Sequence, residues 1–483
     1  MKIGKFTLSE FRGWKTGCVV LLFWAVGAIG SSAQTFNTLL SFDGSDGSGP
    51  NALIQGFDGN FYGTTGFGGT NGDGTFFKST PAGTLTTIYS FCGQTNCADG
   101  ERPVTVVQGR DGNFYGVTLI GGLLSCGLSG SGCGTVFKIT SAGALTTLHT
   151  FSEGTDGGFP AALLQGTDGN FYGVTGSTPK NDGTVFKITA AGALTTLHTF
   201  KGSDGGNPEG LMQATDGNFY GTTVNGGGGL GGTVFKMTPA GTLTTLVFFS
   251  EGGPAHPLAG LMQASDGNFY GTTTNLNAGD PYGTVFQMTP SGSLSVIYSF
   301  CRRTLNCPGG NDPQATLVQG TDGNLYGTTT LGGGHNGPSG CGTVFQITLG
   351  GTLTTLQDFD LTNGCNPVAA LLQDTNGNFY GTTSGGGANS VGTVFSLNMS
   401  LGPFVTTNPT MGNAGIKVGI LGTNLKGATA VSFNGTAAKF SVVGKSVIVA
   451  TVPAEATTGF VTVTTPTGTL TSNVAFQIGQ TDK

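Results

Sequence analysis

The charged residues that interrupt the repeating pattern of this chain are its first candidates for chemistry. Carboxylates, arginines and histidines that converge can supply the acid and base that cleave a glycosidic bond. Seven such residues fall in long, varied segments: Glu101, Arg102, His256, Arg302, Arg303, Asp312 and His335. We predict that they lie on one binding face, because binding residues concentrate on long loops held by a rigid scaffold. The alternative for each residue taken singly is a solvated loop side chain.

Three familiar catalytic arrangements are missing from the sequence. It contains no serine–histidine–aspartate spacing, no phosphate-binding loop beside a helix and no triplet of metal ligands. We therefore predict no catalytic residue, no cofactor and no bound metal. The charge-poor, uniform repeats favour a noncatalytic protein, although the sequence leaves open whether the chain is an enzyme.

The candidate residues lie between seven copies of one repeat, 48 to 57 residues apart. The phrase Asp/Asn-Gly-Asn-Phe/Leu-Tyr-Gly begins at Asp58, Asp111, Asp168, Asp216, Asp266, Asp322 and Asn376. In the third copy, apolar or alternating runs at 160–165, 171–175, 183–189 and 194–200 are separated by short turns, typical of strands. Four strands per repeat predict the blades of an all-β, seven-bladed β-propeller.

The two ends of the repeat region are complementary. Residues 34–42 read like an isolated fourth strand, and the last repeat stops after Leu397 without one. We predict that the N-terminal strand completes the seventh blade, so that the propeller at 34–398 is closed and has no open sheet edge. Short alternating strands with Gly and Pro turns then predict a small Ig-like β-sandwich at 402–479.

Two residues that recur in every repeat allow more than one interpretation. The turn aspartate suggests calcium, or a side chain that stabilises its own turn. A glutamine ends each predicted first strand, at Gln55, Gln108, Gln165, Gln213, Gln263, Gln319 and Gln373. These side chains either line a central channel or satisfy neighbouring backbone groups.

The first 33 residues are typical of a secretory signal. A basic start precedes an apolar run at 18–30 and the small residues before Gln34. We expect cleavage near Ala33 and a protein that is secreted, at the cell surface or in the periplasm, with no membrane span in the mature chain. The alternative is an uncleaved anchor.

Eight cysteines follow the predicted signal, an even number that favours disulfides in an exported chain. We predict the pairs Cys92–Cys97, Cys126–Cys133, Cys301–Cys307 and Cys341–Cys365. Zinc is the alternative, but no histidine stands at ligand spacing from any pair.

Charge restricts the partners of the mature chain. Four of the 19 basic residues and one of the 25 acidic residues lie before Gln34, which leaves a formal charge of −9. Nucleic acids and anionic membranes require clustered basic residues, so neither is expected as a partner. We predict a monomer with an unknown extracellular ligand, of which a glycan and a cell-envelope component are examples.

The repeated phrases DGNFYGTT, GTVFKIT and LTTL resemble those of the GloVer tandem-repeat family over residues 35–398, and residues 402–479 resemble the IPT/TIG immunoglobulin-like domain. The first resemblance implies an exported bacterial repeat protein without an established activity. We therefore expect a noncatalytic binding or scaffold protein that uses the loop-rich propeller face. An extracellular polysaccharide lyase or hydrolase on the same face is the alternative.

Overall fold

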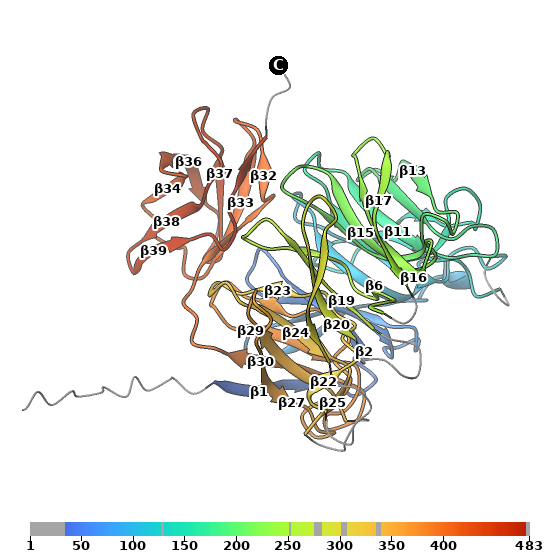
Figure 1. Ribbon diagram of the computed structural model, residues 1–483. Coiled ribbons are helices and arrows are strands. Elements are labelled where there is room, and N and C mark those ends of the chain that lie inside the picture. Colours follow the sequence, from blue (N-terminus) through green and yellow to red (C-terminus); the bar gives the residue numbers. More distant parts are fainter. Residues whose placement is uncertain are drawn as a thin grey trace, which may run out of the picture. The chain divides into compact units, whose positions relative to one another are not determined.

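The computed structural model describes residues 34–126, 130–250, 253–274, 283–300, 307–334 and 340–479. These residues are almost entirely β-structure, with one 3-10 turn, η1 (Thr95–Cys97), and no α-helix among them (Figure 1). No helix in this described part has the length and apolarity to cross a membrane. The all-β class predicted from the sequence is confirmed.

Each of the first six repeats folds into an antiparallel four-stranded sheet whose strands pair in chain order. The first repeat forms β2 (Ser48–Gln55), β3 (Phe61–Phe67), β4 (Thr75–Ser79) and β5 (Leu85–Ser90). The second forms β6 (Glu101–Gln108), β7 (Phe114–Ile120), β8 (Thr135–Ile139) and β9 (Leu145–Thr150). The third forms β10 (Gly158–Gln165), β11 (Phe171–Gly176), β12 (Thr184–Ile188) and β13 (Leu194–Thr199). The fourth forms β14 (Gly206–Gln213), β15 (Phe219–Asn225), β16 (Leu230–Met237) and β17 (Leu243–Ser250).

The later repeats have shorter first strands. The fifth forms β18 (Met262–Gln263), β19 (Phe269–Thr273), β20 (Thr284–Met288) and β21 (Leu294–Ser299). The sixth forms β23 (Val318–Gln319), β24 (Leu325–Thr329), β26 (Thr343–Ile347) and β27 (Leu353–Asp358), beside the ribbon of β22 (Cys307–Asn311) and β25 (Leu331–Gly333). The seventh contributes β28 (Leu372–Gln373), β29 (Phe379–Thr383) and β30 (Thr393–Asn398).

The N-terminal strand supplies the fourth strand of the seventh sheet. β1 (Thr35–Ser41) pairs antiparallel with β30, and Thr35 lies opposite Asn398. The sheet therefore joins the two ends of the repeat region, as the sequence predicted. Within every repeat, two threonines at matching positions of the second and third strands share a buried hydrogen bond; in the third repeat these are Thr175 and Thr184, 2.9 Å apart.

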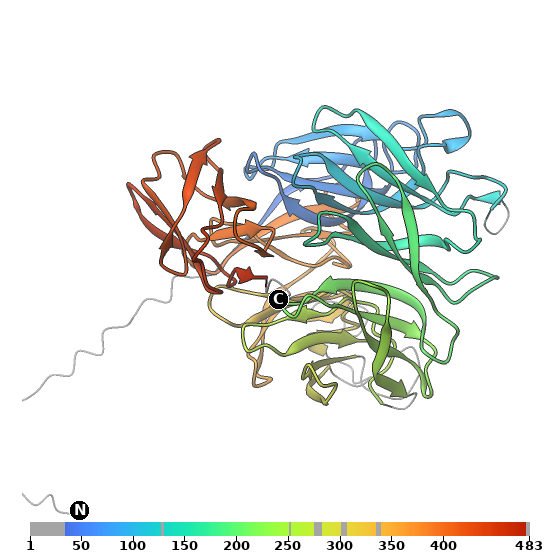
Figure 2. The same cartoon turned by 90° about the horizontal axis from the view of Figure 1, so that it is seen from above.

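Successive sheets pack against each other through apolar clusters, giving a propeller-like arrangement (Figure 2). A further cluster contains Phe61 of the first repeat and Tyr380 of the seventh. The Phe-Tyr pair of the repeated phrase explains this packing, because neighbouring strand residues point to opposite faces. The tyrosine of one sheet contacts the phenylalanine of the next, as Tyr115 does Phe171 with ring centroids 4.0 Å apart. The sixth repeat has Leu325 in place of the phenylalanine.

A second inter-sheet contact occurs where each first strand begins. The residue before the opening proline has a left-handed backbone in all seven repeats, with φ between 52° and 61°: Gly49, Arg102, Phe159, Asn207, His256, Asp312 and Asn366. In six of these residues, all but Asp312, the backbone N–H donates to a carbonyl of the preceding repeat over 2.7–2.9 Å in the described structure. The acceptor for Gly49, one of the six, is Val391 of the seventh repeat. This uncommon conformation is therefore maintained by a repeated hydrogen bond.

The C-terminal strands form two four-stranded sheets and one short parallel pair. One sheet contains β31 (Val405–Asn408), β33 (Lys417–Gly422), β37 (Val447–Thr451) and β36 (Lys439–Val442). The other contains β35 (Thr436–Ala437), β34 (Ala430–Phe433), β38 (Val461–Thr465) and β39 (Gly468–Thr471), and β32 (Met411–Gly412) pairs with β40 (Gln477–Ile478). Residues of both sheets, among them Ile420 and Phe433, share one buried core, as expected for an Ig-like domain.

Replacing Phe186 by alanine tests the inter-sheet core. Phe186 is fully buried between the second and third sheets, so truncation should reduce the free energy of unfolding by roughly 3–5 kcal/mol. Urea denaturation measures this change. The exposed Thr195 of β13 provides a control, since its replacement by alanine should change stability by about 0.5 kcal/mol or less. Equal stability of the two variants would contradict the packing.

Candidate functional site

The glutamine belt, the seven glutamines at the ends of the first strands, connects neighbouring sheets. In six repeats the backbone N–H two residues after one glutamine donates to Oε1 of the next glutamine, as Arg110 does to Gln165 over 3.1 Å. Between the seventh and first sheets the contact runs from Nε2 of Gln55 to the hydroxyl of Thr375, 3.1 Å away. The interpretation that these side chains satisfy neighbouring backbone groups is confirmed.

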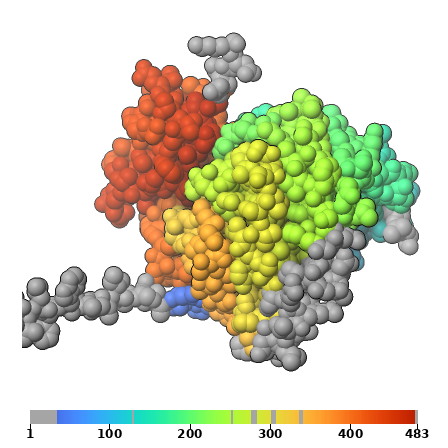
Figure 3. Space-filling model, viewed as in Figure 1, coloured from blue at the N-terminus to red at the C-terminus, as the bar shows by residue number. Residues whose placement is uncertain are grey.

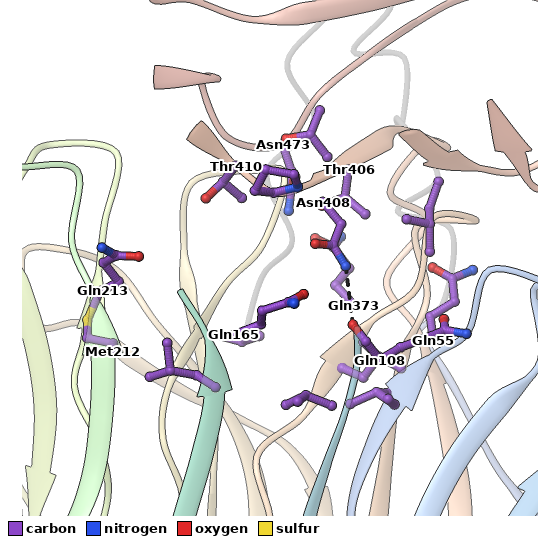
Figure 4. Close-up of a pocket in the computed structure, with 18 of the residues that line it drawn as sticks. Gln55, Gln108, Gln165, Met212, Gln213, Gln373, Thr406, Asn408, Thr410 and Asn473 are labelled. Atoms are coloured by element: carbon purple, nitrogen blue, oxygen red, sulfur yellow. Dashed lines mark hydrogen bonds between the residues drawn. The ribbon is translucent and has the colours of Figure 1, made fainter. Parts of the chain in front are cut away.

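Six members of the glutamine belt also line a pocket of about 610 Å³, which we call the carboxamide pocket. They are Gln55, Gln108, Gln165, Gln213, Gln319 and Gln373, and the seventh member, Gln263, is not among the lining residues. The C-terminal domain supplies the opposite wall, including Thr406, Asn408, Thr410 and Asn473 (Figure 4). The two interpretations of the glutamines are therefore compatible, because each side chain bonds the backbone and faces the pocket.

Hydrogen bonds connect the C-terminal domain to the turns around this pocket. The Ser446 hydroxyl donates to the Phe57 carbonyl over 2.9 Å, and Asn408 Nδ2 donates to the Gln108 carbonyl over 3.5 Å. The backbone N–H of Phe404 donates to Thr375 O over 3.0 Å. The space-filling view shows the red C-terminal surface against repeats coloured orange and green (Figure 3).

The carboxamide pocket contains no Asp, Glu, Lys, Arg, His or Cys among its lining residues. Two of its lining residues, Thr407 and Asn473, each have a side-chain oxygen that is inaccessible to solvent and has no hydrogen-bond partner in the described structure. Charged residues stand next to the lining residues in the chain without lining the pocket themselves: Asp58, Asp168 and Asp374 directly follow lining residues, and Arg110 is the second residue after Gln108. Burial raises the pKa of Asp374 to about 6. The lining residues can therefore form hydrogen bonds but cannot transfer protons in the neutral pH range.

The turn aspartates stabilise their own turns. Asp168 accepts hydrogen bonds from Asn170, Tyr172 and Lys187 over 2.7–2.9 Å. Burial acts to raise the pKa of Asp168, but these hydrogen bonds, led by that from Lys187, outweigh it and lower the pKa to about 2. The carboxylate is thus occupied within its own repeat, in agreement with the turn interpretation.

The structure describes four of the seven residues predicted for the loop-rich face. Glu101 begins β6, and burial raises its pKa, as does repulsion from Asp73. The Arg102 guanidinium lies 4.9 Å from the centroid of the Phe67 ring. Arg302, Arg303 and His335 lie outside the described residues.

The other two described residues of the loop-rich face are His256 and Asp312. His256 is buried, and its Nδ1 lies 3.0 Å from the Val224 carbonyl oxygen. Asp312 accepts a hydrogen bond of 2.8 Å from Gln314, and burial raises the pKa of its carboxyl. No hydrogen bond or ion pair joins any two of the four described residues. Arg102, His256 and Asp312 nevertheless share one position, before the opening proline of their repeats, which the sequence analysis did not recognise.

Three predicted disulfides are confirmed: Cys92–Cys97, Cys126–Cys133 and Cys341–Cys365. Cys307 is also disulfide-bonded, whereas Cys301, its predicted partner, lies outside the described residues. Two of the bonded pairs lie near a glutamate, Glu101 or Glu153. Because a metal-binding cysteine must be a free thiolate, these groups are not zinc sites in this disulfide-bonded form.

Glu209 is a buried acid that the sequence analysis missed. It is the second residue after Asn207 in β14 and accepts a 2.8 Å hydrogen bond from the Asn207 amide. Burial raises the pKa of Glu209 to about 7, although the hydrogen bond acts to lower it. A comparison of first strands could have found it, because no other repeat has an acidic residue directly after its opening proline.

The sequence matches two family profiles. The Gloeobacter/Verrucomicrobia repeat matches three overlapping segments, at residues 26–231, 122–336 and 208–439. The IPT/TIG domain matches residues 404–478. No curated protein sequence matches this chain.

Three solved structures resemble the fold distantly. A protein from Lactobacillus plantarum is 18% identical, and the alignment covers 64% of this chain and 84% of that protein with a TM-score of 0.44. A gluconolactonase from Xanthomonas campestris is 13% identical over 61% of this chain and 85% of its own, with a TM-score of 0.36. A protein of unknown function from Bacteroides thetaiotaomicron is 16% identical over 76% of each chain, with a TM-score of 0.39. At this level of similarity, the three structures do not indicate a function for this chain.

Replacing Glu209 by glutamine should change how stability depends on pH. The folded-state pKa of about 7 lies above the ordinary value of 4.5, so the folded protein retains a proton that the unfolded chain releases. Stability from this group is therefore lost as pH rises from 4.5 to 7. Between pH 4.5 and 7, the free energy of unfolding of the variant should therefore rise relative to that of the parent by up to roughly 3 kcal/mol, at about 1.36 kcal/mol per pKa unit.

Urea denaturation at several pH values measures the difference between parent and variant. The difference should be small below pH 4.5, grow up to pH 7 and stay constant at higher pH. A difference that does not vary with pH would contradict the burial of an ionisable group at this position.

Proposed function

This chain belongs to the Gloeobacter/Verrucomicrobia repeat family and carries an IPT/TIG domain at residues 404–478, and we propose that it is an exported, noncatalytic binding protein. One observation supports this function above the others. The carboxamide pocket is of a size typical of small-molecule sites, yet none of its lining side chains titrates near neutral pH. General acid–base catalysis requires such a group within reach of the substrate. The pocket is suited to retaining a ligand, not to converting it.

The scaffold of this binding protein is a closed propeller of seven blades at residues 34–398, followed by the Ig-like domain at 402–479. Three observations support closure. β1 completes the sheet of the last repeat, Phe61 packs against Tyr380 with ring centroids 4.4 Å apart, and Gln55 bonds Thr375. Each contact joins the first repeat or N-terminal segment to the seventh repeat, and closure leaves no exposed sheet edge.

Export is part of the proposal. Residues 1–33 have the basic start, apolar run and small-residue end of a cleaved signal. Disulfides form and persist in oxidising compartments, and three are present among the described residues. The mature protein is then secreted, at the cell surface or in the periplasm. The loop-rich face, with Glu101, Arg102, His256 and Asp312, is a second surface for binding a glycan or cell-envelope component.

A polysaccharide lyase or hydrolase is the second candidate function, and Glu209 favours it. A buried carboxyl with a pKa of about 7 retains its proton near neutral pH and can act as a general acid. If this function holds, Glu209→Gln abolishes polysaccharide cleavage without unfolding the protein.

Deleting residues 34–42 tests the closed propeller. A chain that starts at Asp43 loses β1, the buried Phe42 and the contacts of the partly buried Phe36. We expect the free energy of unfolding to fall by roughly 3–6 kcal/mol, counting two large apolar side chains. Urea denaturation measures the loss, and a peptide of residues 34–42 added in trans should restore part of it. Unchanged stability would exclude closure by this strand.

The binding function predicts that a ligand stabilises the protein and is recovered unchanged. A thermal-shift screen of glycans, peptides and cell-envelope fractions should give ligands that raise the melting temperature. The rise should grow with the ratio of ligand concentration to Kd. Mass spectrometry of each ligand after long incubation provides the second measurement. Turnover of a stabilising ligand would favour the enzyme, and failure to bind any of these fractions would argue against both functions.

A further inference from the structure

The glutamine belt retains hydrogen-bonding capacity on the side that faces the carboxamide pocket. A primary amide has two N–H donors and two acceptor lone pairs. Gln165 uses one acceptor position for the Arg110 N–H and one donor for the Gly169 carbonyl, 2.9 Å away. Gln108 and Gln213 use the same two kinds of contact. One donor and one acceptor position therefore remain available on each of these three carboxamides, whereas Gln319 and Gln373 use both N–H donors within the protein and retain an acceptor position alone.

The opposite wall adds acceptors and hydroxyl groups. Thr407 is 4% exposed, and its Oγ1 has no hydrogen-bond partner in the described structure. Asn473 Oδ1 is likewise buried without one. Buried polar atoms in proteins are nearly always paired with protein or with water. Because neither of these two oxygens is accessible to solvent, neither faces the open pocket, and Thr407 lies on the same face of β31 as the core residue Val405. Accessible polar side chains of this wall belong to Thr406, Asn408 and Thr410 (Figure 4).

Aliphatic side chains lie directly next to these polar groups. The residue before each lining glutamine is apolar, and all six line the pocket: Ile54, Val107, Leu164, Met212, Val318 and Leu372. Phe57 and Phe404 are the aromatic lining residues. The pocket thus pairs an apolar surface with a circle of uncharged donors and acceptors, which suits a ligand having C–H faces and hydroxyl edges.

Charged ligands fit this environment poorly. A buried ion needs an opposite charge or a dense set of hydrogen bonds to replace its hydration. The lining residues supply no charge that could pair with an ion. The volume of about 610 Å³ lies within the roughly 300–1,000 Å³ that small-molecule pockets span.

Resting on the proposed binding function, we propose that the carboxamide pocket holds an uncharged carbohydrate of one or two sugar units. The glutamine belt bonds the sugar hydroxyls from one side. Thr406, Asn408 and Thr410 bond them from the other, and the aliphatic residues contact the C–H face. Recognition of the sugar consequently requires both the repeats and the C-terminal domain.

Isothermal titration calorimetry of the whole mature chain with matched sugars tests the ligand class. The neutral probes are cellobiose, maltose and N,N′-diacetylchitobiose, and the charged partners are cellobiouronic acid and deacetylated chitobiose. At least one neutral disaccharide should bind, and its charged partner should bind at least tenfold more weakly. Equal binding of the two members of a pair would overturn the inference while leaving the binding function intact.

Point variants test the location of the site. Thr406→Val removes a half-buried hydroxyl that lines the pocket, so the fold should keep its melting temperature while sugar affinity falls about tenfold. Gln165→Met and Gln263→Met remove equivalent hydrogen bonds, but only Gln165 lines the pocket. Both should lower the melting temperature similarly, and only Gln165→Met should weaken sugar binding by about tenfold or more.

The remaining outcomes distinguish this inference from the proposed function. Sugar binding that Thr406→Val and Gln165→Met leave unchanged would place the sugar elsewhere and overturn the inference. If Gln165→Met and Gln263→Met weaken sugar binding equally, the loss reflects reduced stability of the fold, and the inference is likewise overturned. If no sugar binds but a peptide or another small molecule does, the ligand class is wrong and the binding function stands. If nothing binds in the broad screen, both fail.

Discussion

The hydrogen bond from the turn of one sheet to the glutamine of the next is the interaction on which the rest of the structure depends. Each first strand is short, and in the later repeats β18, β23 and β28 contain two residues each. Such strands have few ladder contacts of their own. The glutamine belt and the left-handed residues before the prolines attach the two ends of a first strand to the preceding sheet. These contacts give hydrogen-bond partners to backbone groups that would otherwise be buried away from water without one.

The same glutamines relate the architecture to the candidate site. A residue that is required in every repeat for packing also places an amide at the pocket, so a uniform polar surface arises from repetition alone. Side chains that break the repeat pattern, such as Arg102, Glu209 and Asp312, occur at the opposite, opening end of the first strands. The pocket beside the C-terminal domain thus has a uniform, uncharged lining, whereas the end at the long loops is chemically varied.

Much of the fold follows from local pattern. The strand order within repeats, the pairing of β1 with β30 and three disulfides were predictable because each involves recurring residues or neighbours along the chain. The candidate site was less predictable. The sequence singled out charged loop residues, yet four of them are engaged in separate local contacts. Glu209 escaped notice because its raised pKa depends on burial by distant segments.

The sequence by itself determined the β-structure, the repeat, the residues that fill each sheet and the neutral character of the glutamine positions. These properties depend on side-chain periodicity and turn chemistry, which act over a few residues. Only the tertiary structure decided that six glutamines share one pocket with Thr407 and Asn473. More than 300 positions separate Gln55 from Thr407 in the chain, and no local pattern specifies which surface of the C-terminal domain meets the turns. Packing between distant segments sets that contact, and with it the chemistry the pocket offers.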